Sequence, residues 1–215
     1  MITEQDLATL RREVRARLSD RRFRHTVGVE EAATALAAYL MPQATAELRA
    51  AALLHDIAKE LPAQEQLSLI REEGLPLSAM EENMPALFHS LAAVPLIRRD
   101  FPAYAVPRIL SAVRYHTVGA PQMTLFDKII FIADYVEENR TYPACISARQ
   151  FLFGGLRRGD TDARELLDRT VLMSIDATVM SLIGREDYIA PDTVFTRNAV
   201  LSALSHSYGA QDTSN

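Results

Sequence analysis

Residues 51–60 read Ala-Ala-Leu-Leu-His-Asp-Ile-Ala-Lys-Glu, an apolar run that ends in an adjacent histidine and aspartate. Successive residues of a helix point about 100° apart, so His55 and Asp56 cannot both be buried without polar partners. Both side chains can, however, reach a metal ion beside that turn. A lone histidine on an apolar face is more often a hydrogen-bonded core residue. The interpretation therefore depends on the rest of the chain.

Apolar residues recur with helical periodicity along the chain, and no segment alternates convincingly as a strand does. Glycines and prolines stand mostly between the periodic segments. We predict an all-α fold: a single domain over residues 1–215, a helical bundle with its core at about 20–140 and a C-terminal helical extension at about 160–207. The predicted helices are 3–18, one that begins near 20, 43–60, 63–73, 87–98, 107–116, 124–138, and a tail over 161–207 that is broken near Gly184 and at Pro191.

The composition is that of an ordinary soluble globular protein, with 48% hydrophobic and 24% charged residues. Its net charge of −5 does not favour binding to nucleic acid. The N-terminal residues are charged and lack the apolar core of a signal peptide, and no apolar run approaches the ~20 residues of a membrane span. The single cysteine, Cys145, excludes an internal disulfide. We expect a cytoplasmic protein that binds neither nucleic acid nor membrane.

Four histidines and a distant aspartate stand at helix-length intervals, each on an otherwise apolar helical segment. The aspartate, Asp134, lies in the centre of IIFIADYV, where burial costs several kcal/mol unless the carboxylate is paired or coordinates a cation. A salt bridge to an arginine or lysine is the alternative for this residue. A metal site explains the whole set with one assumption, and its members are His25, His55, Asp56, His89, His116 and Asp134.

Imidazoles combined with carboxylates suit a transition metal better than Mg²⁺ or Ca²⁺, which prefer oxygen ligands. Asp56 has two oxygens and can bridge two ions, as carboxylates do in two-metal hydrolases. Such a site activates a bound water and polarises a phosphoryl group. The sequence therefore predicts hydrolysis of a phosphoanhydride or a phosphoester, with one or two divalent or trivalent ions.

Basic residues flank the predicted ligands. Lys59 follows His55 by four residues, Arg24 adjoins His25, and Arg140 comes just after the helix of Asp134. Any one of them can be a solvated surface charge, but together they are consistent with contacts to phosphates. The chain has no glycine-rich phosphate-binding motif.

An isolated histidine, then His-Asp, then a distant aspartate resembles the signature of the HD-domain metal-dependent phosphohydrolases. Six strings narrow the resemblance to the YqeK branch, the symmetrical bis(5′-nucleosyl)-tetraphosphatases, which split diadenosine tetraphosphate into two ADP. In chain order they are RFRHTVGVEEAA, AALLHDIAKEL, LFHS, VRYHTVG, KIIFIADYVEENR and PDTVFTRN. The resemblance covers roughly residues 20–200.

The resemblance implies an iron-type site held by His25, His55, Asp56 and Asp134, and a nucleotide substrate. His89 and His116 are left open between ligands of a second ion and contacts to the phosphates. Catalytic roles are expected for Asp56, His89 and His116. The expected substrate-binding residues are Arg24, Lys59, His89, His116, Thr117, Arg140, Thr193, Arg197 and Asn198.

Two other functions share these features. A nucleotidase or phosphodiesterase of the HD type would keep the metal ligands and act on other nucleotides. A non-catalytic regulator would bind nucleotide without turnover, but a missing ligand would then be expected, and all six positions are filled. The sequence leaves open whether the protein is a homo-oligomer.

Overall fold

The computed structural model describes residues 2–74, 77 and 81–207, and the regular structure in them is entirely helical. No strand occurs in that part of the chain. The predicted all-α fold is therefore confirmed.

The two N-terminal helices begin at side chains that cap them. The hydroxyl of Thr3 accepts from the backbone of Asp6, and the Asp6 carboxylate in turn accepts from the Thr3 backbone, which starts α1 (Glu4–Arg17). Ser19 caps α2 (Asp20–Leu40) in the same position. Each cap satisfies an amide that the first helical turn leaves without a partner.

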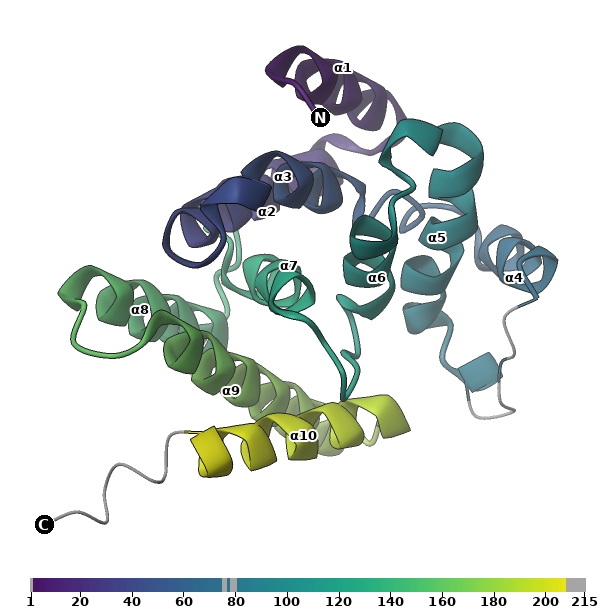
Figure 1. Ribbon diagram of the computed structural model, residues 1–215. Coiled ribbons are helices and arrows are strands. Elements are labelled where there is room, and N and C mark those ends of the chain that lie inside the picture. Colours follow the sequence, from purple (N-terminus) through teal and green to yellow (C-terminus); the bar gives the residue numbers. More distant parts are fainter. Residues whose placement is uncertain (1, 75–76, 78–80, 208–215) are drawn as a thin grey trace, which may run out of the picture.

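Helix α7 (Leu125–Val136) lies in the middle of the molecule (Figure 1). It packs against α2, α3 (Thr45–Leu54), α6 (Pro107–Tyr115) and α9 (Ala163–Gly184). Its isoleucines Ile129, Ile130 and Ile132 are fully buried. A polar side chain on this helix therefore points either into the protein core or into an enclosed site.

Helix α5 (Phe88–Asp100) packs between α4 (Ala63–Glu72) and α6 on one side of this core. Short 3₁₀ helices connect the elements here and before α3. They span Pro42–Ala44, Glu81–Asn83, Pro85–Leu87 and Pro102–Tyr104.

The segment 55–60 corrects one prediction. A continuous helix was expected over 43–60, but α3 ends at Leu54 and the following residues form tight turns. Backbone bonds in this segment join the amides of Ile57, Lys59 and Leu61 to the carbonyls three residues earlier, for example Lys59 to Asp56 at 2.9 Å. Nδ1 of His55 meanwhile bonds the backbone oxygen of Ala52, three residues before it. This tighter winding changes the direction in which Lys59 points.

Helix α8 (Pro143–Arg158) was not anticipated, since the predicted extension began near residue 160. It packs on α9, which in turn contacts α7 and α10 (Pro191–Ser207). On its inner face, Arg149 donates to the backbone oxygens of Val136, Glu137 and Arg140. The C-terminal helices thus hold the loop that follows α7.

None of the helices in the described part of the chain combines the length and the apolarity that a membrane crossing requires.

Candidate metal centre

The predicted ligands come from five helices and meet at the centre of the fold. His25 lies in α2, His89 near the start of α5 and Asp134 in α7. His55 and His116 are the C-cap residues that directly follow α3 and α6, and Asp56 follows His55 directly. His55, Asp56, His89 and His116 are each at most 4% exposed.

Each of the four histidines uses Nδ1 to bond an acceptor outside the cluster. A carbonyl or carboxylate oxygen can only accept, so each ring donates its Nδ1–H and presents Nε2 to the centre. Metal-binding histidines are oriented in this way. The acceptors are the Glu137 carboxylate for His25 (3.1 Å), and the backbone oxygens of Ala52, Ala86 and Val113 for His55, His89 and His116 (2.6, 2.8 and 2.6 Å).

The two oxygens of Asp56 face two different pairs of histidines. Oδ2 lies 3.7 Å from Nε2 of His25 and 3.4 Å from Nε2 of His55. Oδ1 lies 3.5 Å from Nε2 of His89 and 3.6 Å from Nε2 of His116. A carboxylate in this position can serve two neighbouring cation positions.

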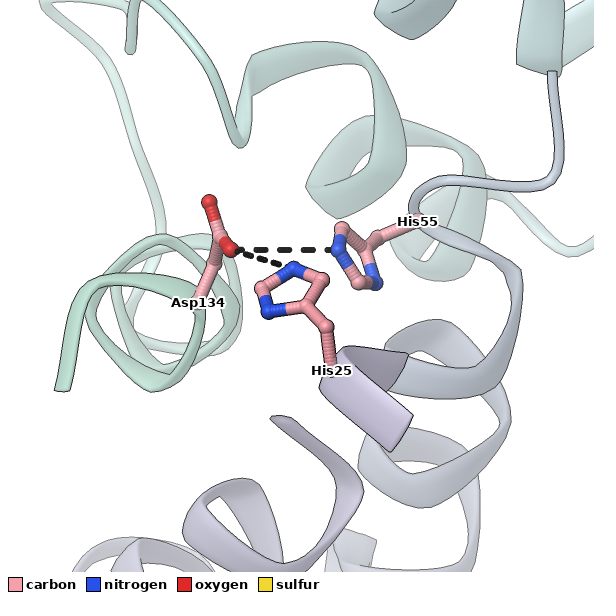
Figure 2. Close-up of side chains that lie close together, drawn as sticks. All are labelled: His25, His55 and Asp134. Atoms are coloured by element: carbon pink, nitrogen blue, oxygen red, sulfur yellow. Dashed lines mark ion pairs between the residues drawn. The ribbon is translucent and has the colours of Figure 1, made fainter. Parts of the chain in front are cut away.

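Asp134 completes the first of these positions (Figure 2). Its Oδ1 lies 3.0 Å from Nε2 of His25 and 3.9 Å from Nε2 of His55. Both Nε2 atoms are buried, and neither has a hydrogen-bond partner among the residues that the structure describes. A buried nitrogen without a partner is costly, and a cation between these rings and the carboxylate removes that cost. The residues present therefore fit a metal ion.

The carboxylates set the electrostatics of the cluster. Burial disfavours the charged form of His25, but Asp134, Glu137 and Asp56 outweigh it and raise the pKa of His25 to about 9. Burial would also raise the pKa of Asp134, yet Arg140 and His25 hold that pKa well below its usual range. Carboxylates that stabilise a protonated imidazole can stabilise a metal cation at the same position when the imidazole is neutral.

Two arginines pair with the two aspartates. Nη1 of Arg22 lies 2.6 Å from Oδ2 of Asp56, and Nη2 of Arg140 lies 2.5 Å from Oδ1 of Asp134. The salt bridge that was the alternative for Asp134 is thus present, and the histidines surround the same oxygen. Both arginines also line the adjoining cavity, where a substrate anion can approach them.

A cavity of about 330 Å³ opens onto the centre. Its walls include Lys59, Thr117 and, from α9, Ser174 and Thr178. The ammonium of Lys59 lies 3.1 Å from Nδ1 of His89, and burial lowers the pKa of Lys59. The hydroxyl of Thr117 lies 3.1 Å from Nε2 of both His89 and His116. His89 and His116 therefore open onto the same cavity as the aspartates.

The remaining predicted substrate contacts lie farther out. Arg24 lines a neighbouring cavity beside His25, and Thr193 lines another that adjoins Lys59 and Thr117. Arg197 pairs with Asp176 on α9, and Asn198 is exposed on α10. Neither Arg197 nor Asn198 lines the cavity of the metal centre, and their binding roles stay predictions.

Sequence reasoning missed two residues that hold the site. Glu137, which is 2% exposed, orients His25, and Arg22 neutralises Asp56. Both had a signal in the sequence, because each is three residues from a predicted ligand and so on the same helical side. Glu137 lies three residues after Asp134, and Arg22 lies three residues before His25.

The model of the HD domain matches residues 22–139, which include all six residues of the cluster. The chain is 34% identical to the symmetrical bis(5′-nucleosyl)-tetraphosphatase of Bacillus subtilis, over 88% of this chain and 94% of that protein. It is also 34% identical to the protein of the same name from Halalkalibacterium halodurans, over 87% and 93% of the two chains. The chain belongs to the HD-domain family, in the branch of these phosphohydrolases.

The fold of this HD-domain protein has a solved relative. A crystal structure from Clostridium acetobutylicum, described as a predicted HD superfamily hydrolase involved in NAD metabolism, superposes with a TM-score of 0.79 at 28% identity. The match covers 91% of this chain and 97% of that one, so it includes the C-terminal helices as well as the HD core. HD domains are metal-dependent hydrolases, which agrees with the cluster of histidines and aspartates.

Proposed function

We propose that this protein hydrolyses diadenosine tetraphosphate symmetrically into two molecules of ADP. One observation carries the chemistry: four histidine Nε2 atoms converge on the carboxylates of Asp56 and Asp134 beside a cavity with cationic walls. The printed names of the curated relatives support the substrate.

The metal is proposed to be held by His25, His55, Asp56 and Asp134. His89 and His116, which face the other oxygen of Asp56, would hold a second ion. This set of nitrogen and oxygen donors suits iron and its first-row neighbours, and we propose iron. When bound, such a metal lowers the pKa of a coordinated water and polarises a phosphoryl oxygen.

The chain's own side chains position the polyphosphate. Lys59 and Arg140 both line the cavity. A cationic side chain beside a phosphate offsets the negative charge that develops when a bond to phosphorus breaks. The hydroxyl of Thr117 lies between the two outer histidines, where it can donate to a phosphate oxygen. Most of the catalytic effect in phosphoryl transfer comes from such positioning and charge neutralisation.

Hydrolysis in oxygen-18 water, followed by mass spectrometry, tests this function. The expected products are two molecules of ADP, one of which carries the label on its terminal phosphate. ATP and AMP would instead show asymmetric cleavage and would overturn the proposed position of the cut. Cleavage of mononucleotides with no action on any dinucleotide would favour the nucleotidase alternative. Binding without turnover of any nucleotide by the metal-loaded protein would favour the regulator.

A further inference from the structure

A second cavity adjoins the metal centre on the side of His25. It has a volume of about 540 Å³ and lies between the start of α2 and the segment that joins α7 to α8. Arg22 and Arg140 line both this cavity and the cavity of the metal centre, so the two cavities adjoin at these side chains. Arg21, Arg24 and Tyr142 also line it.

The cationic side chains of this cavity are only partly paired with carboxylates. Arg22 and Arg140 are already paired with Asp56 and Asp134. Within the described part of the chain, no ion pair or hydrogen bond engages the guanidinium of Arg21 or Arg24, although Glu60 lies close enough to interact electrostatically with Arg21. Most other arginines of this acidic chain form an ion pair with a carboxylate. Two cationic side chains without an ion-pair partner, at one cavity, point to an anionic ligand.

An aromatic ring lines the same cavity. Tyr142 is the residue before the first turn of α8, and it is 70% exposed. The Tyr142 side chain forms no capping hydrogen bond with that helix, so capping of α8 does not explain why a tyrosine stands at this position. An exposed ring beside free arginines is suited to stack against a nucleobase whose phosphates reach the cations.

A third cavity also adjoins the metal centre, beside Lys59. It measures about 430 Å³ and shares Lys59, Thr117 and Thr178 with the central cavity. Its other walls are mainly apolar and include Met84, Leu87 and Val118. The cavity of the metal centre therefore adjoins two further cavities, and it shares at least one cationic side chain with each of them.

We propose that the cavity lined by Arg21, Arg24 and Tyr142 binds one nucleoside diphosphate half of the substrate, while the cavity beside Lys59 binds the other half. The inference rests on the proposed function, because a cut at the centre of a tetraphosphate needs room for an equal half on each side of the metal. Arg21 and Arg24 contact the phosphates of the first half, and Tyr142 stacks on its base. Recognition of both halves makes the protein select dinucleotides over mononucleotides.

The number of bound product molecules tests this without turnover. Isothermal titration of the metal-loaded wild type with ADP is expected to give two equivalents per chain, one in each half-site. The double variant Arg21→Gln/Arg24→Gln is expected to retain one equivalent. Arg157→Gln is the matched control, because Arg157 is an exposed arginine that lines a different cavity, and it should retain both. A wild type that binds one ADP, or a double variant that binds two, overturns the proposal.

Kinetic measurements distinguish the proposed contact with the base from the proposed contacts with the phosphates. Tyr142→Ala is expected to raise KM for diadenosine tetraphosphate about fivefold or more, the usual size of a lost base–aromatic stack. Tyr142→Phe, which keeps the ring, should restore the wild-type value. An unchanged KM in Tyr142→Ala, or a KM raised equally in Tyr142→Phe, would contradict a stacking contact with the base. If the wild type does not cleave diadenosine tetraphosphate, the proposed function fails, whereas the ADP titration still tests whether the two half-sites exist.

Discussion

Asp56 is the residue on which the whole centre depends, because both of its oxygens face histidine nitrogens and it also pairs with Arg22. Removing it takes away a donor from both proposed cation positions. The surrounding helices keep their apolar contacts, since the cluster lies at their ends rather than along their packed faces.

Asp56→Ala should therefore abolish bound metal and turnover while leaving helical content unchanged. Metal analysis and circular dichroism of the purified variant check this. Asp168→Ala is the control, because Asp168 pairs with Lys128 outside the cluster, and its loss should cost about 1–3 kcal/mol of stability with metal retained. Normal metal content and activity in Asp56→Ala would end the assignment of this residue.

Gly28 makes room for the carboxylate that orients His25. A Cβ at Gly28 would lie 2.3 Å from Oε2 of Glu137 and 2.9 Å from the Asn139 amide. Gly28→Ala should therefore push Glu137 away from His25 and lower metal affinity by about 10–100-fold, as the loss of an orienting partner does.

A competition titration with a metal chelator measures this affinity. Gly154→Ala serves as control, because it also replaces a glycine within a helix, yet its new Cβ meets only Arg158 at an ordinary 3.4 Å. If both variants bind metal as the wild type does, Glu137 does not control the affinity of the site.

For individual residues, the sequence indicates which side chains meet, but not which hydrogen bonds orient them. Histidines on apolar stripes and an aspartate in an apolar helix cannot all be buried without a common partner, which is why their convergence could be predicted. The backbone acceptors of Nδ1 carry no side-chain signature, so the orientation of the rings is visible only in the structure. The roles of the six residues in catalysis stay predictions.

Helices α3 and α6 each end directly before a histidine of the cluster, so the positions at which these helices end place His55 and His116. A regular helix over 43–60 would have put Lys59 on the side of His55. The tight turns after Leu54 direct it to His89 and into the cavity instead. Periodicity alone could not reveal this, because residues 55–60 contain no glycine or proline that would mark the end of the helix.

Helix α8 was missed for a different reason. Two adjacent glycines interrupt its apolar pattern, and glycine in a helix interior lowers helical propensity. The structure accounts for one of them, since a Cβ at Gly155 would lie 2.6 Å from Leu166 of α9. Close packing of α8 on α9 thus outweighs the propensity. Pro143 at its start and Gly159 at its end are ordinary boundary signals that could have found it.

Helix α10 rests on the loop that follows His116. Gly119 in that loop has a φ of +76°, and a Cβ there would lie 2.6 Å from Cγ2 of Thr196. Gly119→Ala should therefore strain the backbone and also displace α10, with a loss of unfolding free energy larger than the ~1 kcal/mol of the backbone effect alone.

Urea unfolding of two variants separates these effects. Gly74 has a φ of +70°, and no atom of the described residues lies within 4 Å of the position that a Cβ would take, so Gly74→Ala reports mainly the strain of the backbone. An equal loss in the two variants would show that the contact between Gly119 and Thr196 does not hold α10.

For the molecule as a whole, we propose that the HD core and the C-terminal helices form one domain. Helix α9 packs against both α7 and α2, and its Ser174 and Thr178 line the cavity of the metal centre. Differential scanning calorimetry should then show a single transition with equal calorimetric and van't Hoff enthalpies. Two resolved transitions would mean that residues beyond about 160 unfold separately.

Removal of the metal should lower the stability of this whole unit, because the proposed ligands lie in α2, α5 and α7 or directly after α3 and α6, and are brought together only in the folded state. A ligand that binds only the folded chain adds about 2.7 kcal/mol when its concentration is 100 times Kd. For a chain of this length that corresponds to a rise in Tm of about 5–10 °C. Calorimetry of the chelator-treated and metal-restored protein measures it. Asp56→Ala should show no such response to metal, since its site is incomplete. An equal rise in Tm for this variant would place the stabilising ion elsewhere than at the cluster.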